Sequence, residues 1–378
     1  MSDVKIFSAD SHAPEGDVLS KYMDNDFQFR APRIETRERA GKPQDFYILE
    51  GFPPIEVPDV PEGERAAARF QARAEGGVNT TFRGWDPVER LKDQDTDGVV
   101  GEVIHTNNLG FRLFWLTDAS LQRACFRAYN DWLADYCSPD PNRLVGVPLL
   151  AVYDIDEAIA ELHRTHKRNL RGAMIPLSPP TACPPYTSAV YDRLWAAAHE
   201  LDTPLILHAI TGGGYETPLW WTSWWREDFS LGMIIRPHEA QRVLAQFILS
   251  GVLERFPRLK LISAENGTDW IPWYVGRLER AARGPFSYPT RLSLKPIEYF
   301  LRNVYFSYID EPHVVANRNL LGPDKLMFAT DYPHRQSTWP NSVHVAQRDT
   351  SALPAEVSRA LIYDNVIKAF NITSQALP

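Results

Sequence analysis

Short apolar segments alternate with longer amphipathic segments along most of the chain. Near-continuous apolar character predicts eight strands, at residues 4–10, 99–105, 144–150, 172–176, 204–208, 259–265, 304–308 and 325–331. Apolar positions with helical spacing predict helices between and after them, at residues 118–137, 154–167, 188–201, 237–256, 267–283 and 354–371. Apolar strands separated by helices are typical of a parallel sheet that is buried on both faces. Eight such units predict closure into a (β/α)₈ TIM barrel, an α/β fold, rather than an open sheet.

Two connections are too long for ordinary barrel loops, about residues 13–84 and residues 209–236. They follow the first and the fifth predicted strands at the carboxyl end, where barrel enzymes carry their chemistry. We therefore expect lids or pocket walls inserted into a single domain of residues 1–378. The second insertion contains the tryptophan-rich segment 218–225. That segment is either the packed core of a lid or an apolar pocket wall, and the wall implies a substrate with apolar surface.

Composition narrows the possible functions. The length of 378 residues exceeds the ~250 residues of a simple barrel and fits a barrel with insertions. A net charge of −8 argues against a nucleic-acid partner. The chain has neither an apolar stretch of ~18 residues nor a signal-like N-terminus, so we expect a cytoplasmic protein without a membrane partner. Its three cysteines lack CxxC spacing, which argues against a thiolate zinc site.

Side chains that can bind metals lie at the ends of five of the predicted strands or just after them. They are Asp10, His12 and Glu15 for the first strand, His105 for the second, His208 for the fifth, Glu265 and Asn266 for the sixth, and Asp331 and His334 for the eighth. In a closed barrel these strand ends converge on one mouth. A divalent ion would relieve the repulsion between several carboxylates placed there. The residue types suit Zn, Fe or Mn.

Each candidate also has a structural interpretation. Asp10 and His12 could order a loop, and Asp331 could cap the turn that follows it. His208 could be a buried core histidine with its hydrogen bonds satisfied. Loop hydrogen bonding could account for Glu15, His105, Asn266 and His334. His238 begins the helix predicted at 237–256 and is a further candidate ligand.

Several motifs together resemble the amidohydrolase-related superfamily. They include SADSHAPE (8–15), GWDPVERLKDQDTDGV (84–99) and KLMFATDYPH (325–334), and the similarity extends over nearly the whole chain. The nearest branch is the one with the aminocarboxymuconate-semialdehyde and resorcylate decarboxylases. The resemblance implies a metal at the barrel mouth, bound through Asp10, His12, His208 and Asp331.

The sixth strand departs from the decarboxylase pattern. Decarboxylases of this branch carry a catalytic histidine there, whereas this chain reads SAENG (263–267), with Glu265 at that place. A carboxylate can act as a base or bind a second metal, and Glu15 and Asn266 could supply further ligands. The Glu–Asn pair resembles a smaller branch of non-haem dinuclear iron monooxygenases. We therefore favour a monooxygenase with two Fe ions (or Fe and Mn) that hydroxylates a small, partly apolar substrate with electrons from an external donor.

Other functions remain open from the sequence. A single Zn or Mn ion could activate water for hydrolysis of an amide or lactone, with Asp331 or Glu265 handling the proton. A single metal could instead hold a substrate carboxylate and a neighbouring hydroxyl for non-oxidative decarboxylation. The predicted catalytic residues in these schemes are Glu265, Asp331 and His334. A binding module without activity is a further alternative, and a homo-dimer is expected by analogy.

Overall fold

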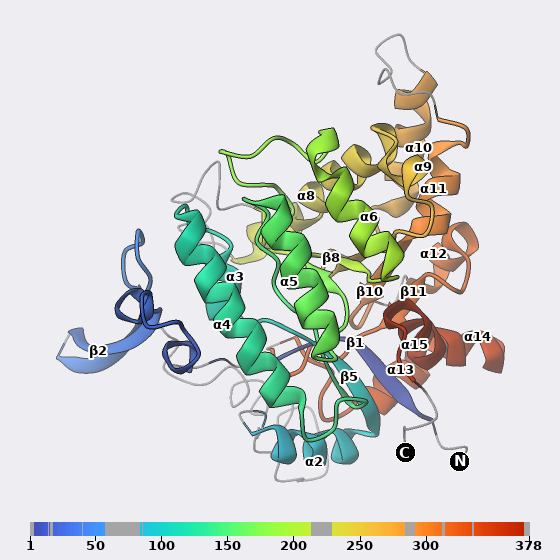
Figure 1. The fold of residues 1–378 in the computed structure, drawn as a ribbon. Helices are drawn as coiled ribbons and strands as arrows, with labels where there is room; N and C mark the ends of the chain where they lie inside the picture. The colour runs from blue at the N-terminus through green and yellow to red at the C-terminus, as the bar shows by residue number, and fades with distance from the viewer. Residues whose placement is uncertain are drawn as a thin grey trace.

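The computed structural model describes residues 4–13, 15, 18–39, 41–56, 84, 86–212, 229–283, 292–311, 314–334 and 336–373. Eight parallel strands alternate with helices along the described chain (Figure 1). They are β1 (Ile6–His12), β5 (Val99–His105), β6 (Leu144–Gly146), β7 (Ala173–Met174), β8 (Leu205–His208), β9 (Leu261–Ala264), β10 (Val304–Tyr308) and β11 (Leu326–Phe328). Each overlaps one of the eight predicted strands.

The strands form a closed ring. Hydrogen-bonded pairing gives one group in the order β1-β5-β6 and a second in the order β11-β10-β9-β8-β7. Isolated parallel bridges join the groups, Ser11 with Tyr332 on one side and Leu149 with Met174 on the other. Beside the first bridge, the backbone N–H of Asp331 donates to the carbonyl of Asp10 at 3.0 Å. The predicted (β/α)₈ barrel is therefore confirmed.

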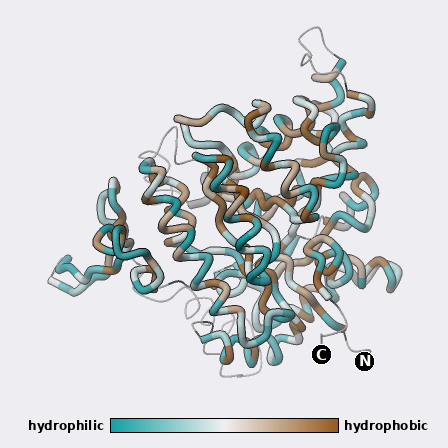
Figure 2. Tube along the Cα trace, viewed as in Figure 1, coloured by the Kyte–Doolittle hydropathy of each residue, from teal (hydrophilic) through white to brown (hydrophobic). Residues whose placement is uncertain are grey.

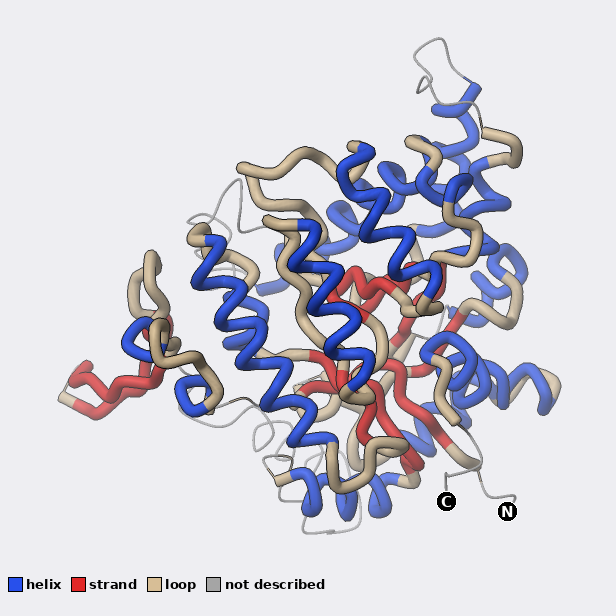
Figure 3. The backbone as a smooth tube through the Cα atoms, in the orientation of Figure 1, coloured by secondary structure: helices blue, strands red, loops and turns tan. Residues whose placement is uncertain are grey.

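Helices surround the strands, which occupy the centre of the molecule in Figure 3. The longer ones are α2 (Pro87–Asp97), α4 (Ala119–Cys137), α5 (Ile155–Lys167), α6 (Asp192–Glu200), α8 (Phe229–Leu249), α10 (Ile271–Arg283), α11 (Pro296–Asn303), α12 (Val314–Leu321) and α13 (Ser342–Thr350). The shorter ones include α3 (Asn108–Leu113), α9 (Val252–Arg255), α14 (Ala355–Arg359) and α15 (Asn365–Phe370). Hydrophilic and hydrophobic positions alternate along these helices (Figure 2), as expected when one face packs on a barrel.

Local signals explain where several helices begin and end. Asp86, Asp118 and Asp154 cap α2, α4 and α5 by accepting hydrogen bonds from backbone N–H groups of the first turn. The helix predicted at 237–256 is broken into α8 and α9, because Gly251 between them adopts a left-handed φ of 77°. A glycine takes this conformation without the steric cost that other residues incur.

The strands provide the core. Every residue of β1 is buried, and the same holds for β8, β9 and β10. Polar residues are buried there too, at the strand ends, so the apolar core changes into a polar cluster at the barrel mouth. No helix among the described residues is both long and apolar enough to cross a membrane.

The insertion after β1 contains a small antiparallel sheet. Its strands β2 (Arg33–Arg39), β3 (Lys42–Ile48) and β4 (Ile55–Glu56) lie in the order β2-β3-β4. In Figures 1 and 3 this sheet stands to one side of the barrel, beyond α3 and α4 in this view. A lid or pocket wall was predicted here, without strands. The tryptophan-rich segment 218–225 lies outside the described residues.

Candidate metal centre

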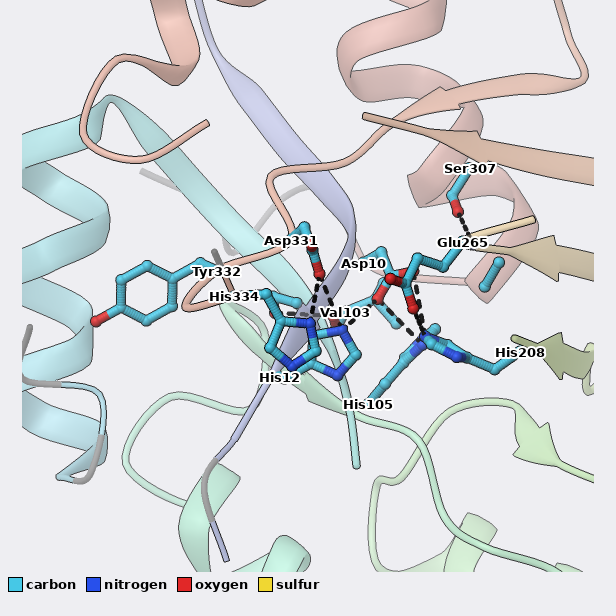
Figure 4. Close-up of polar contacts among 12 residues, drawn as sticks. Asp10, His12, Val103, His105, His208, Glu265, Ser307, Asp331, Tyr332 and His334 are labelled. Carbon is cyan, nitrogen blue, oxygen red and sulfur yellow. Dashed lines mark hydrogen bonds and ion pairs between the residues drawn. The ribbon is translucent and has the colours of Figure 1, made fainter. Parts of the chain in front are cut away.

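A buried cluster of histidines and carboxylates lies at the carboxyl ends of the barrel strands (Figure 4). β1 contributes Asp10 and His12, and β5 and β8 end at His105 and His208. Glu265 follows β9, and Asp331 and His334 follow β11. The convergence of strand ends in a closed barrel thus brings together residues that are more than 300 positions apart in the sequence.

Asp10 lies at the centre of the cluster and is fully buried. Its Oδ1 is 3.3 Å from His105 Nδ1 and 3.4 Å from His12 Nε2, and its Oδ2 is 3.5 Å from His208 Nε2. Asp10, His12 and His208 each offer one ligand atom, and these atoms all lie within 4.8 Å of one another. This separation suits side chains that share one cation.

Asp331 extends the cluster on the other side of His12. Its Oδ1 lies 3.1 Å from His12 Nε2 and 3.0 Å from His334 Nδ1. The rings of His12 and His334 stack, with centroids 3.8 Å apart. His334 Nε2 is also 3.1 Å from the side-chain oxygen of Asn107, which follows β5. His334 is therefore oriented by contacts on both of its ring nitrogens.

The ligand atoms of this cluster lack hydrogen-bond partners among the described residues. This holds for both carboxylate oxygens of Asp10, for Nε2 of His12 and His208, and for Oδ1 of Asp331, all of which are buried. Leaving a buried polar group unsatisfied costs about 1–3 kcal/mol. Asp10, His12 and His208 form one group whose ligand atoms lie close enough to share a divalent cation, and His12, Asp331 and His334 form a second such group. The residues therefore fit a metal with mixed nitrogen and oxygen ligands.

Nδ1 of both His12 and His208 is hydrogen-bonded to a backbone carbonyl. His12 Nδ1 lies 2.6 Å from the carbonyl of Thr106, and His208 Nδ1 lies 2.9 Å from the carbonyl of Ala209. A carbonyl can only accept, so each Nδ1 carries the proton and each Nε2 presents its lone pair to the cluster. Outer hydrogen bonds of this kind orient metal-binding histidines.

The charged groups of the cluster shift one another's pKa values. Burial acts to raise the pKa of Asp10, but His105, His208 and His12 outweigh it and lower that pKa. Burial likewise opposes ionisation of Asp331, and His334 and His12 outweigh it, so its pKa is also lowered. Burial is the dominant influence on His105 and lowers its pKa to about 3. Two carboxylates therefore stay ionised and His105 stays neutral at neutral pH.

Backbone conformation places the acids that follow β9 and β11. Glu265 and Asp331 both have a left-handed φ of 56°, which is unfavourable for residues other than glycine. Such strain is concentrated at functional sites, where the surrounding structure enforces it. The N–H of Glu265 donates to Ser307 Oγ at 3.2 Å, and its Oε2 lies 3.8 Å from His208 Nε2. Glu265 thus borders the cluster on the side of His208.

The structure directs two of the predicted ligands away from the cluster. Glu15 accepts hydrogen bonds from Thr106 Oγ1 at 2.6 Å and from the N–H of Asn107 at 2.7 Å. His238 is exposed on α8. Asn266 donates its side-chain amide to the carbonyls of Leu207 and Ala264, so it ties β8 to β9, and its Oδ1 is buried without a hydrogen-bond partner among the described residues.

Two residues beside the cluster were not predicted from the sequence. Besides Asn107, the ring of Phe111 lies 4.7 Å from that of His208 and 5.8 Å from that of His12, and forms an apolar wall. Both residues belong to the segment that runs from the end of β5 into α3. The signal was the polar run Thr106–Asn107 directly after His105, in the place of an ordinary turn.

Comparison with known proteins assigns the chain to a family. Residues 80–372 match the amidohydrolase family. A 2-amino-3-carboxymuconate-6-semialdehyde decarboxylase from Dictyostelium discoideum is 25% identical over 260 residues, or 66% of this chain and 67% of the relative. A gamma-resorcylate decarboxylase from Rhizobium radiobacter is 23% identical over 291 residues, or 69% of this chain and 82% of the relative.

Solved structures share the fold. An amidohydrolase from Mycobacterium avium subsp. paratuberculosis superposes with a TM-score of 0.76 at 18% identity, covering 98% of this chain and 99% of the other. A dihydroxybenzoic acid decarboxylase from Polaromonas, crystallised with manganese and the inhibitor 2-nitroresorcinol, gives a TM-score of 0.62 at 20% identity, with coverage of 83% and 90%.

These findings correct the prediction of an oxidoreductase. The relatives are decarboxylases, which are carboxy-lyases, so the preference for a monooxygenase was wrong. The comparisons do not support the two-iron centre either, and Glu15, which was counted toward the second ion, accepts hydrogen bonds from Thr106 and Asn107. The chain belongs to the amidohydrolase family and is a metal-dependent enzyme on the amidohydrolase barrel.

Proposed function

We propose that this protein is a non-oxidative decarboxylase that uses one divalent cation and acts on a small organic acid. The observation that carries the proposal is the buried cluster at the barrel mouth, whose ligand atoms lack hydrogen-bond partners. The relatives support the reaction class, because they are decarboxylases of gamma-resorcylate and of 2-amino-3-carboxymuconate-6-semialdehyde.

The proposed ligands are Asp10, His12, His208 and Asp331. Manganese is the first choice of metal, since two structurally similar decarboxylases were crystallised with it and the mixture of carboxylate and imidazole suits it. When bound, the cation supplies a positive charge that binds the substrate carboxylate together with a neighbouring oxygen. Phe111 lies beside His12 and His208, where its ring would pack on a flat, conjugated substrate.

Decarboxylation breaks the bond between the carboxylate and its neighbouring carbon. Carbon dioxide leaves, the electron pair stays on that carbon, and a proton must replace the lost group. We assign delivery of this proton to Glu265, which borders the cluster beside His208 and is almost buried. Asp331, held by His334, accepts a hydrogen bond from a hydroxyl of the substrate and orients it.

The direct test measures release of carbon dioxide by metal-free protein reloaded with Mn²⁺. Suitable substrates are 2,6-dihydroxybenzoate and 5-carboxyvanillate, which give two neighbouring enzymes their names. We expect carbon dioxide from at least one hydroxybenzoate, and in deuterated water we expect one deuterium at the vacated carbon. The proposal is wrong if the loaded protein releases no carbon dioxide from any conjugated acid of this size.

One observation favours hydrolysis as a second candidate. Glu265 stands where the resemblance predicts a histidine for decarboxylation, and a carboxylate next to a metal site can serve as a general base toward water. A panel of small lactones and amides, assayed with the same Mn²⁺-loaded protein, tests this function. Hydrolysis without release of carbon dioxide from any hydroxybenzoate would favour it over the decarboxylase.

A further inference from the structure

A buried arginine lies directly behind the metal cluster. Arg90 of α2 is fully buried, and its partner Glu102 of β5 is 3% exposed. A buried ion pair of this kind is a poor source of stability, because desolvation offsets the attraction between the charges. Its retention next to the ligand strand therefore calls for another explanation.

We infer that Arg90 is a positioning residue for the metal centre, and that its guanidinium fixes the end of β1 that carries Asp10 and His12. The inference rests on the metal centre proposed above. It concerns the geometry of the ligands and leaves the choice between decarboxylation and hydrolysis untouched.

The guanidinium makes three hydrogen bonds that join β1 to β5. Nη1 donates to the carbonyl of His12 at 2.7 Å, and Nη2 donates to Ser11 Oγ at 2.8 Å. Nε donates to Glu102 Oε2 at 2.7 Å, and the same oxygen accepts from Gln94 Nε2 at 3.1 Å. The rigid, planar fork of arginine can hold three acceptors in fixed directions.

Regular strand pairing is interrupted at Asp10. The register between β1 and β5 shifts between Ser8 and Ser11, and pairing resumes with Ser11–Ile104 and His12–His105. Side chains add contacts where it resumes, because Ser11 Oγ donates to the carbonyl of Val103 at 3.0 Å and itself accepts from Arg90. Arg90 thus reinforces the ligand-bearing end of β1 next to the irregularity at Asp10.

Arg90 also contacts the segment that carries Asp331. Its guanidinium carbon lies 4.8 Å from the ring centroid of Tyr332, within cation–π range. The hydroxyl of Tyr332 donates to Asp93 at 2.6 Å, and its carbonyl accepts from the N–H of His12 at 2.6 Å. Both ligand-bearing segments are therefore held against one face of α2, which carries Arg90, Asp93 and Gln94.

The test compares R90K with R143K in metal-free protein. Arg143 also links α2 to β5, through the carbonyls of Leu91 and Val100 and the carboxylate of Asp95, but it contacts no proposed ligand. Mn²⁺ is titrated into each protein, free ion is followed by EPR, and the melting temperature of the metal-free state is recorded. A lysine keeps the charge but cannot reproduce the three directed hydrogen bonds.

We expect R90K to bind Mn²⁺ at least about 10-fold more weakly than wild type, as is typical when an outer-shell partner is lost. R143K should keep the wild-type affinity even where its melting temperature falls as far. S11A removes one of the three acceptors of Arg90 with little change in volume, so its Mn²⁺ affinity should fall less than that of R90K. This variant replaces R90K in the test if R90K does not fold.

Wild-type affinity in R90K, or in S11A where R90K does not fold, would overturn the inference while leaving the metal centre intact. An equal loss in R143K would overturn it as well, because general destabilisation would then explain the effect. Failure of the wild-type protein to bind Mn²⁺ or Zn²⁺ would instead reject the proposed metal centre, and the inference with it.

Discussion

Asp10 faces three imidazoles at once, at distances between 3.3 and 3.5 Å. Both of its oxygens are buried and lack hydrogen bonds, which is a costly arrangement for a carboxylate unless a cation is bound. The other proposed ligands each contribute one such atom, whereas Asp10 contributes two. It is therefore the residue on which metal binding should depend most.

Replacing Asp10 with asparagine should abolish tight metal binding. The amide keeps the size of the side chain and removes its charge, so Mn²⁺ affinity should fall by more than about 100-fold, beyond the 10–100-fold usual for outer-shell partners. Titration of Mn²⁺ into metal-free D10N measures this. The control is D97N, because Asp97 is also buried but accepts from the N–H of Ser342 away from the cluster. Equal losses in the two variants would contradict the assignment.

Glu265 should affect turnover more than metal content. If it carries the proton, E265Q retains one Mn²⁺ per chain and lowers kcat by about 10²–10⁴-fold, the range typical of proton-transfer groups. Elemental analysis and the carbon dioxide assay together test this. E265H should recover part of the activity, since histidine is the residue that the resemblance predicts at this place. Loss of the metal in E265Q would show instead that Glu265 is a ligand.

Much of the cluster was predictable from the sequence, because strand ends in a closed barrel must converge. Asp10, His12, His208 and Asp331 were expected together for that reason, and the structure places them in two groups of possible ligands that share His12. That they bind one metal stays a prediction. The direction of each side chain was not predictable. Glu15 turns toward the backbone of Asn107, a partner that no spacing rule identifies. The reaction was mispredicted because one carboxylate at Glu265 is compatible with several chemistries.

At the scale of elements, hydrophobic periodicity located all eight strands and most of the helices around them. It failed for β2 and β3, where residues 33–39 read RIETRER and are mostly exposed. A small sheet whose first strand is largely exposed needs no apolar alternation, so the pattern carried no signal. It also missed the break at Gly251, which depends on a single backbone angle.

The carboxyl group of Glu311 joins the loops after β9 and β10, and its pKa is raised. Glu311 accepts hydrogen bonds from the N–H and hydroxyl of Thr268, at 3.2 and 2.7 Å. Burial raises its pKa from 4.5 to about 7. The folded state therefore binds a proton that the unfolded state releases between these pH values, so this contribution to stability is complete below pH 4.5 and is lost as pH rises through 7.

Replacing Glu311 with glutamine should remove that pH dependence. The amide resembles the protonated acid, so E311Q should match wild type near pH 4.5 and exceed its stability above pH 7, by up to about 3 kcal/mol. Urea unfolding at a series of pH values measures the difference. The control is E356Q, which changes an exposed carboxylate on α14. Parallel stability curves for wild type and E311Q would contradict the assignment.

At the scale of the whole molecule, the proposed metal lies where the barrel closes. Asp10 and His12 belong to β1, the first strand, and Asp331 follows β11, the last. An isolated bridge and a few hydrogen bonds join these two segments, in place of a regular ladder. A cation bound to both segments would add a link across that seam. Metal binding should therefore be coupled to the stability of the complete barrel.

Removing the metal should lower the melting temperature, and adding it back should restore the loss. A ligand that binds only the folded state at 100 times its Kd stabilises it by about 2.7 kcal/mol, which corresponds to a few degrees for a protein of this size. Calorimetry of metal-free protein with increasing Mn²⁺ measures the shift, and D10N, which lacks the central carboxylate, should show none. A shift of equal size in D10N would place the stabilising ion elsewhere on the molecule and would separate barrel stability from the cluster at its mouth.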